Sequence, residues 1–369
     1  MVPVSTRLPP NGFRAGRGCG TCTVTPLRDR LPGPLLALRQ NLSVTMWTAD
    51  DSGPPERMQP AGSVDGAGVH CLGESKMEIP AETPKSPSTE QFKEQIREEW
   101  TDSATVSAWR KWHSKSVVQT QEATDAIVQA AHVAHGLRIL DLASGTGEPA
   151  LTLARAVGPE GHVTATDLGA GMLALAEENA QQAGLTNLTF QEADAHALPF
   201  QDEIFDRVTS RFGVMYFADV GQALLEIRRV LKAGGLMALA AWGPVEQNPI
   251  SLAALGPFLR RTSIAPPPTG APHPFRFASP DSLAQELERA GFNRVEVHLR
   301  TISSAWPGPP EEFWEHFRDI AVAFRPIIDG LAPDQRQQAI SEVIEGFARY
   351  YDGQRVNAPV VIVLATGVR

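Results

Sequence analysis

Apolar and polar residues follow the periods of helices and strands over most of the chain. Phe92, Ile96 and Trp100 recur every four positions, which is the spacing of one helical face. Residues 121–135 place small apolar side chains on one face in the same way. Residues 89–136 are therefore expected to form N-terminal helices that serve as a lid or cap.

Short apolar runs then alternate with amphipathic stretches. The predicted strands are residues 138–143, 163–167, 188–194, 206–213 and 236–242. The predicted helices between them are residues 149–157, 171–184 and 220–231. Each crossover is long enough for a parallel connection, so the pattern predicts an α/β domain with an open, doubly wound sheet.

The remaining chain continues this sheet and adds helices. Ser279 is a predicted N-cap, with Pro280 at the first position of the helix at 279–292. Further strands are predicted at residues 293–302 and 358–368. Between them, an aromatic-rich helical insert is expected at about 309–353, within a main domain that spans 137–369.

The first part of the chain has a different composition. Residues 1 to about 90 contain twelve prolines and ten glycines, so they cannot bury enough apolar surface to offset chain ordering. Residues 1–88 are expected to be a disordered extension, with a first part that vaguely resembles a transit peptide. Cys19 and Cys22 form a C-x-x-C pair, but zinc needs about four ligands, so no metal site is predicted.

Charge and apolar content exclude several classes of function. The formal net charge is -9, and the chain from Met77 onward contains 25 basic and 36 acidic side chains. So acidic a domain is a poor partner for a phosphate backbone, and nucleic acid is not expected as a ligand. No run of eighteen apolar residues predicts a transmembrane segment. The three cysteines are compatible with a reducing compartment, and a cytoplasmic location is expected.

The first predicted strand leads into a glycine turn, "LRILDLASGTGEPA", at 137–150. Gly145, Gly147 and Ala150 fit the dinucleotide pattern G-x-G-x-x-G/A, which keeps an NAD(P)-dependent oxidoreductase open as an alternative. Asp141, however, stands at the end of the strand, where a carboxylate repels a pyrophosphate and attracts an ammonium group. The turn therefore favours a ligand with an amino-acid tail, such as S-adenosylmethionine.

Two further acids stand at the ends of the next two predicted strands. Asp167 is placed to bind both hydroxyls of a ribose, which suits NAD and S-adenosylmethionine equally. Asp194 can accept the adenine amino group while Ala195 presents its backbone N–H. Three acids at the ends of three successive strands favour a nucleoside site over separate solvated side chains.

Several segments in this order resemble a known family. "ILDLASGTGEPALTLARA", "NLTFQEADAHALPFQDEIFDRV" and "EIRRVLKAGGLMALAAWGP" are similar to class I S-adenosylmethionine-dependent methyltransferases, and within them to the ubiquinone/menaquinone-biosynthesis methyltransferases. The resemblance covers about residues 100–245. It implies a Rossmann-like, doubly wound sheet of seven strands with an antiparallel last strand, plus helical lid elements. It also implies S-adenosylmethionine as the cofactor.

The resemblance implies a set of cofactor-binding residues. These are Ala143, Gly145, Thr146 and Gly147 along the methionine portion, with Asp141 at its ammonium group; Asp167, Leu168 and Met172 at the ribose and adenine; Asp194 and Ala195 at the adenine edge; and Arg211, Phe212 and Gly213 closing the pocket. Arg211 stands where the quinone-pathway enzymes more often have serine. This departure and the helical insert distinguish the chain from those enzymes.

Methyl transfer from a sulfonium mainly requires a positioned acceptor and the exclusion of water. A general base is needed only when the acceptor must lose a proton. Candidates are His113 and Tyr216, and also His196 and Asp219, each of which equally fits a structural role, Asp219 as an N-cap.

The flanking segments contain four tryptophans, Trp109, Trp112, Trp306 and Trp314, which fit core or lid packing better than an aromatic cage for a cation. Their placement on both segments also suggests an apolar acceptor pocket. The leading hypothesis is therefore an S-adenosylmethionine-dependent methyltransferase that acts on a small or lipid-like apolar acceptor. The alternatives are an NAD(P)-dependent oxidoreductase and a non-catalytic cofactor-binding relative. The sequence does not specify the acceptor, the choice between C-, O- and N-methylation, or the oligomeric state.

Overall fold

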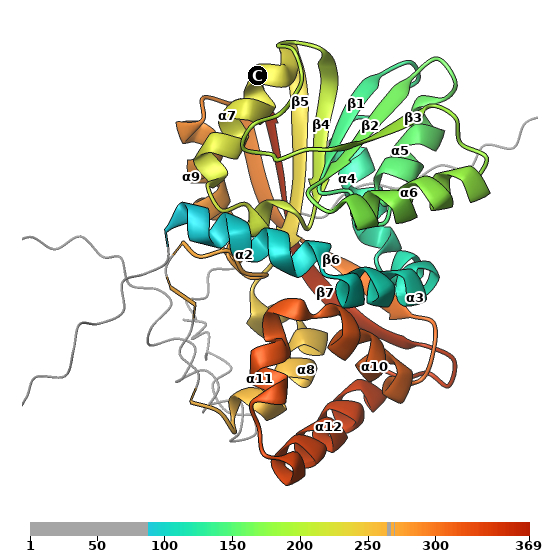
Figure 1. The fold of residues 1–369 in the computed structure, drawn as a ribbon, viewed down its shortest axis with the longest axis vertical. Coiled ribbons are helices and arrows are strands. Elements are labelled where there is room, and N and C mark those ends of the chain that lie inside the picture. Colours follow the sequence, from blue (N-terminus) through green and yellow to red (C-terminus); the bar gives the residue numbers. More distant parts are fainter. Residues whose placement is uncertain (1–87, 264–266, 269) are drawn as a thin grey trace, which may run out of the picture. The chain divides into compact units, whose positions relative to one another are not determined.

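The computed structural model describes residues 88–263, 267–268 and 270–369 (Figure 1). Apart from Ser88, the predicted disordered extension lies outside the described residues, and so does the Cys19–Cys22 pair. The longer helices are α2 (Thr89–Thr101), α3 (Ser103–Gln119), α4 (Gln121–Ala130), α5 (Ala150–Val157), α6 (Ala170–Gln182), α7 (Val220–Val230), α8 (Pro249–Leu259), α9 (Pro280–Arg289), α10 (Pro310–Ile320) and α12 (Pro333–Ala348). Shorter helical turns are η1 (Val214–Tyr216), η2 (Val245–Gln247), η3 (Val322–Phe324) and α11 (Arg325–Asp329).

Seven strands of the described residues form one sheet in the order β3-β2-β1-β4-β5-β7-β6. They are β1 (Arg138–Leu142), β2 (His162–Asp167), β3 (Leu188–Glu192), β4 (Phe205–Arg211), β5 (Leu231–Trp242), β6 (Asn293–Trp306) and β7 (Val356–Val368). The neighbours among β1 to β5 are parallel, whereas β7 is antiparallel to both β5 and β6. This order confirms the predicted Rossmann-like, doubly wound sheet with an antiparallel last strand.

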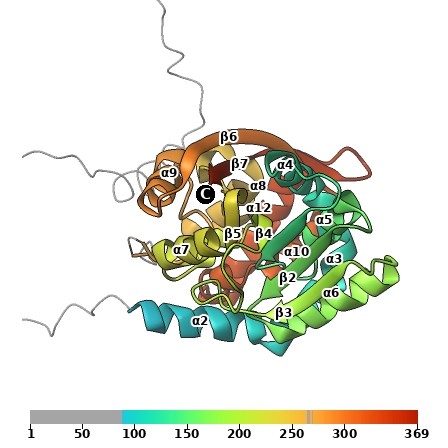
Figure 2. The same ribbon diagram turned by 90° about the horizontal axis from the view of Figure 1, so that it is seen from above.

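Alternate residues of the central strands face opposite helical layers. In β5, Ala238 and Ala240 belong to the same hydrophobic cluster as α4, whereas Met237 and Leu239 pack with α7 and α9. Figure 2 shows α4 and α5 on one side of the sheet and α7 and α9 on the other. Because both faces are covered, the strands are apolar on both sides, as is usual for parallel sheets.

The N-terminal helices begin at side-chain caps. Ser88 and Gln91 form a capping box at α2, since each side chain accepts a hydrogen bond from the other residue's backbone N–H. Asp102 then caps α3 by accepting from the backbone N–H of Thr105 at 2.9 Å. A Cβ added at Gly169 would lie 2.8 Å from the backbone oxygen of Trp100, so the end of α2 contacts the loop after β2.

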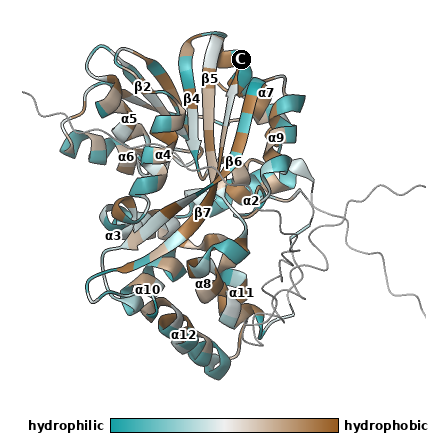
Figure 3. Ribbon diagram, turned by 180° about the vertical axis from the view of Figure 1, so that it is seen from behind, coloured by the Kyte–Doolittle hydropathy of each residue, from teal (hydrophilic) through white to brown (hydrophobic). Residues whose placement is uncertain are grey.

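The last part of the chain forms a long ladder with helices between its strands. β6 and β7 pair from Asn293↔Val368 to Trp306↔Val356. Figure 3 shows the two strands running from the parallel part of the sheet to α8, α10 and α12. Helices α10, α11 and α12 lie where the insert at about 309–353 was predicted, and Ser279 and Pro280 begin α9 as expected.

Helix α8 was not predicted from the sequence. Its residues, PISLAALGPFL, are mostly apolar and include an internal Pro257, so no polar face marks a helical period. The helix packs against α12, and Phe258 is fully buried between segments far apart in the chain. Because the helix is buried on several sides, its sequence lacks the alternating polar and apolar faces by which a surface helix is predicted.

Candidate functional site

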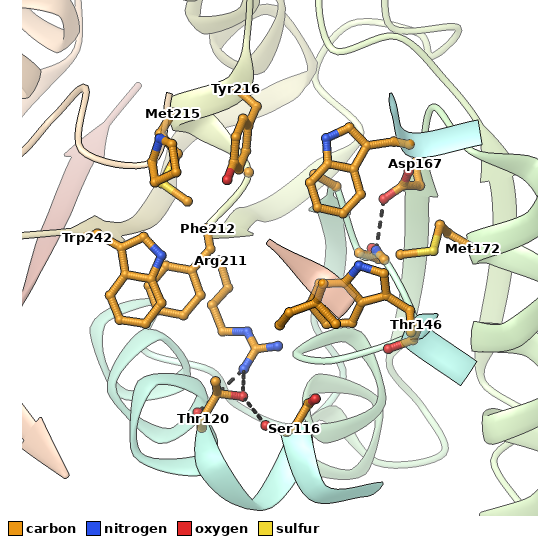
Figure 4. Close-up of a pocket in the computed structure, with 18 of the residues that line it drawn as sticks. Ser116, Thr120, Thr146, Asp167, Met172, Arg211, Phe212, Met215, Tyr216 and Trp242 are labelled. Carbon is orange, nitrogen blue, oxygen red and sulfur yellow. Dashed lines mark hydrogen bonds between the residues drawn. The ribbon is translucent and has the colours of Figure 1, made fainter. Parts of the chain in front are cut away.

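One cavity of about 320 Å³ lies at the carboxyl ends of β1 to β5. It is lined by the glycine turn after β1, by the ends of β2, β3 and β4, and by residues of α2, α3, α8 and α10. Doubly wound sheets bind ligands at this edge, outside the carboxyl ends of their strands. Figure 4 shows side chains from several of these elements converging on the cavity.

The glycine turn requires backbone angles that favour glycine. Gly145 and Gly147 have φ values of 53° and 114°. A Cβ at Gly147 would lie 2.2 Å from a side-chain carbon of Leu151, so the turn also leaves no room for a side chain there. Two non-glycine residues in the cavity wall, Ala143 after β1 and Phe212 after β4, also have positive φ, at 54° and 61°. Such strained positions cluster at functional sites.

Asp167 lies at the end of β2, in the cavity wall, as the sequence predicted. One carboxylate oxygen accepts from the backbone N–H of Gly145 at 2.8 Å, and the other accepts from that of Gly169 at 3.0 Å. Burial nevertheless raises the pKa of Asp167. Each oxygen retains a second acceptor position, which is what two ribose hydroxyls require. Leu168 and Met172 line the cavity beside it.

Asp141 occupies a different place from the one expected. Its side chain is fully buried and is not among the residues that line the cavity. Its two oxygens accept from the hydroxyls of Thr209 at 2.6 Å and Ser144 at 2.7 Å. Burial raises the pKa of Asp141 to about 7, even though these hydrogen bonds favour the ionised form. Asp141 therefore braces the glycine turn from beneath, and a direct contact with a ligand ammonium group does not follow from this geometry.

Asp194 and Ala195 line the cavity after β3, and His196 braces them. The Asp194 oxygen Oδ1 is 2.5 Å from His196 Nδ1 and accepts from the His196 backbone N–H at 2.9 Å. Burial alone would raise the pKa of Asp194, but these hydrogen bonds outweigh it and hold the pKa at about 2. His196 Nε2 accepts from the backbone N–H of Asp219 at 3.0 Å, so the ring hydrogen resides on Nδ1.

The other base candidates are also occupied or shielded. His113 Nδ1 is 2.8 Å from the hydroxyl of Thr146, and burial followed by the charge of Arg211 lowers its pKa. Tyr216 packs edge-on against Trp100, and burial raises its pKa. Asp219 is the N-cap of α7, as predicted. His113, His196 and Tyr216 thus line the cavity, whereas Asp219 does not.

Arg211 extends from the end of β4 across the cavity wall. Nη1 donates to the hydroxyls of Thr120 at 2.6 Å and Thr124 at 3.1 Å, and Nη2 donates to the backbone oxygen of Glu148 at 3.1 Å. The following residue, Phe212, stacks on Trp242 with ring centroids 4.2 Å apart.

The far side of the cavity is aromatic and aliphatic. Its lining includes Trp242, Leu255, Phe275, Phe313, Phe317 and Phe324. Of the predicted tryptophans, Trp109 lines the cavity, whereas Trp112, Trp306 and Trp314 are buried behind it. The acceptor pocket expected from the tryptophans stays a prediction, because three of the four pack in the core and other rings supply this side of the cavity.

Several polar residues of the cavity were not singled out from the sequence, and four of them bear on its chemistry: Ser116, Thr120, Glu148 and His316. Glu148 is 9% exposed, and one of its carboxylate oxygens is buried without a hydrogen-bond partner. His316 is 2% exposed and 2.9 Å from the hydroxyl of Ser116. Glu148 directly follows the last glycine of the turn, which was an available signal. The others come from helices whose contact with the cavity depends on the fold.

Residues 114–253 match the model of the ubiE/COQ5 methyltransferase family. The ubiquinone/menaquinone biosynthesis C-methyltransferase UbiE of Xylella fastidiosa (strain 9a5c) is 43% identical over 109 residues, which are 29% of this chain and 43% of that protein. The protein of the same name from Allorhizobium ampelinum is 33% identical over 175 residues, which are 43% of this chain and 66% of that protein. The chain thus spans less than half the length of the Xylella protein.

Among solved structures, the YcgJ protein of Bacillus subtilis is similar at 21% identity and a TM-score of 0.45, over 68% of this chain and 98% of that one. The fold assignment rests instead on the strand order given above. The family and sequence matches bear out the predicted resemblance to S-adenosylmethionine-dependent methyltransferases. They give no support to the oxidoreductase alternative. Within the described ranges, no helix is long and apolar enough to cross a membrane.

Proposed function

We propose that this chain is an S-adenosylmethionine-dependent methyltransferase that acts on a small or lipid-like apolar acceptor. One observation supports this most: the glycine turn, Asp167 and Asp194 share a single cavity with the aromatic side chains of the C-terminal segments. The family match over residues 114–253 supports the cofactor side. When bound, the cofactor supplies an electrophilic methyl group on its sulfonium.

The residues present fit an amino-acid tail at the glycine turn. Glu148 contributes a buried carboxylate oxygen without a partner, and the exposed Arg155 lies 3.7 Å from its other oxygen. A buried carboxylate oxygen without a hydrogen-bond partner is unfavourable unless a donor approaches it. We therefore assign the cofactor's ammonium group to Glu148, in place of Asp141. Asp167 binds the ribose hydroxyls and Asp194 the adenine amino group.

The acceptor occupies the aromatic side of the cavity. Rings such as Trp242 and Phe313 exclude water there and hold an apolar molecule against the cofactor. His196 is engaged through both ring nitrogens, and the pKa of Tyr216 is raised, so positioning contributes more than proton removal.

Calorimetry of the full chain with S-adenosylhomocysteine tests the cofactor assignment. We expect binding, and a loss of affinity of about 100-fold in Asp167→Ala, because two charge-assisted hydrogen bonds disappear. Asp167→Asn keeps one of the two acceptors for the backbone N–H groups, and urea denaturation of both variants checks that the domain stays folded. Asp202→Ala, an exposed acid outside the cavity, is the matched control.

Two further measurements separate the alternatives. Tight binding of NADH with no binding of S-adenosylhomocysteine would favour an oxidoreductase. Transfer of a labelled methyl group from S-adenosylmethionine to a component of a lipid extract distinguishes the enzyme from a non-catalytic relative. Binding without transfer to any acceptor in a broad screen would contradict the proposed activity.

A further inference from the structure

Arg211 places a positive charge in the cavity wall without an ion-pair partner. Among the described residues, no carboxylate oxygen lies within 4.0 Å of its guanidinium, and its hydrogen bonds go to two hydroxyls and two backbone oxygens. Nε is buried and has no partner at all. A guanidinium has five N–H donors, so at least one that points into a desolvated region is unsatisfied. Leaving such a donor unpaired is unfavourable unless a ligand accepts from it.

The acidic side chains near Arg211 form no ion pair with its guanidinium. Burial lowers the pKa of Arg211, while the charges of Glu148 and Asp141 oppose that effect. Asp141 is held by Thr209 and Ser144, and Glu148 is assigned above to the cofactor's ammonium group. His113, which also faces Arg211, has a lowered pKa and adds no negative charge. With the cofactor bound, the cation remains available to a second ligand.

The guanidinium of Arg211 lies between the two sides of the cavity, because Nη2 contacts the glycine turn at the backbone oxygen of Glu148 and Nη1 lies on the acceptor side. Nη1 of Arg211 donates to the hydroxyls of Thr120 and Thr124. Figure 4 shows the Arg211 side chain beside the stacked rings of Phe212 and Trp242. The hydroxyl of Thr120 donates to the backbone oxygen of Ser116 at 2.8 Å, and the Ser116 hydroxyl contacts His316. A single polar stripe, defined as Arg211, Thr120, Ser116 and His316, thus crosses an otherwise aromatic wall.

We propose that Arg211 is the specificity-determining residue for the acceptor and binds an anionic oxygen on it. The acceptor is then an apolar acid, a molecule with an aromatic or aliphatic body and a carboxylate or comparable acidic oxygen. The body packs on the aromatic wall, and the anion receives the free N–H donors of the planar guanidinium. This inference rests on the proposed function, because it takes the glycine-turn side to be filled by the cofactor.

Competing probes test the proposal: 2-naphthoate and its uncharged analogue 2-naphthalenemethanol, titrated by calorimetry into the full chain saturated with S-adenosylhomocysteine. We expect the wild type to bind naphthoate about tenfold more tightly, because a charge-assisted hydrogen bond forms only with the carboxylate. Arg211→Gln should abolish this preference, whereas its S-adenosylhomocysteine affinity should fall by less than tenfold, because Arg211 contacts the glycine turn only through the backbone oxygen of Glu148. Arg211→Lys keeps the positive charge but loses the planar guanidinium, so it should retain part of the preference for naphthoate. This variant replaces Arg211→Gln in the test if the glutamine variant does not fold.

Arg207→Gln is the matched control. Arg207 lies on the same strand, donates only to the backbone oxygens of Ala131 and Asp206, and does not line the cavity, so the preference should persist. Equal affinities of the two probes, no binding of naphthoate, or a preference that survives Arg211→Gln would overturn the proposal. So would a tenfold loss of S-adenosylhomocysteine affinity in that variant, since Arg211 would then bind the cofactor's carboxylate. Failure of the wild type to bind S-adenosylhomocysteine would instead refute the proposed function, and the probes titrated alone would still test Arg211.

Discussion

The two sides of the cavity are built in different ways. On the cofactor side, polar groups are held by hydrogen bonds to nearby backbone, as Asp167 is by Gly145 and Gly169. On the acceptor side, rings from distant segments stack on one another, as Phe313 does on Trp306 with centroids 5.3 Å apart. The first side is fixed by short loops between strands, and the second by packing of the whole domain.

Because of this difference, the matching family indicates the ligand of the cofactor side better than that of the acceptor side. The family match ends at residue 253, so it includes the ends of β1 to β5 and excludes α10 and η3. Doubly wound sheets bind their ligands outside the carboxyl ends of the strands, and those ends lie within the match. Apart from Trp242, the rings and aliphatic side chains named for the apolar wall lie outside the match, so the acceptor must be inferred from the side chains of that wall.

Removing a ring from the acceptor side should give the largest effect on stability. Phe313 is 1% exposed and packs on Trp306 and on Phe347, whose ring centroid is 4.7 Å away. We expect Phe313→Ala to lower the free energy of unfolding by about 3–5 kcal/mol, because it leaves a cavity among packed rings. Urea denaturation measures this loss. S-adenosylhomocysteine affinity should stay within about twofold, since sites without shared partners act independently.

Glu311→Ala is the control on the same helix, because this side chain is exposed. Its effect on the free energy of unfolding should stay within about 0.5 kcal/mol. If Phe313→Ala weakened S-adenosylhomocysteine binding in parallel with stability, the two sides of the cavity would not be separable.

The same division sets the limit of prediction from sequence. Asp167 and Asp194 were placed correctly because strand ends are predictable and parallel strands bring their carboxyl ends together. Asp141 was placed at the correct strand end. No sequence pattern shows, however, that the hydroxyl of Thr209, 68 residues away, donates a hydrogen bond to it inside the sheet. Arg211 and the rings of α10 meet only in the folded domain, so their juxtaposition could not be predicted.

Asp141 should make the cofactor side pH-dependent. Its pKa is raised from 3.8 to about 7, so the folded chain keeps a proton that the unfolded chain releases. The free energy of unfolding contributed by this group is therefore highest below pH 4 and falls as pH rises to 7, by up to about 4 kcal/mol. The difference in urea stability between wild type and Asp141→Asn, measured from pH 4.5 to 8, isolates this contribution.

The neighbouring hydroxyl sharpens the measurement. Thr209→Val removes a donor that favours the ionised carboxylate, so the fall in stability should extend to higher pH. Parallel pH curves for wild type and Asp141→Asn would show that Asp141 is ionised throughout. The cofactor side would then retain a full negative charge beneath the turn, and the predicted pH dependence of Asp141 would be wrong.

Asp219 should give the smallest effect and decides between a structural and a chemical role. Its Oδ1 accepts from the backbone N–H of Gln222 at 2.9 Å at the start of α7. Asp219→Ala should therefore lower the free energy of unfolding by about 1 kcal/mol, whereas Asp219→Asn, also an effective N-cap, should cost only a few tenths. An amide cannot act as a general base, so the rate of labelled methyl transfer in Asp219→Asn separates the two roles. We expect that rate to stay within about twofold of wild type, because Asp219 holds α7 and, through its backbone N–H, His196. A large loss of transfer with unchanged stability would make Asp219 the base and would place proton removal, rather than positioning, at the boundary between the two sides.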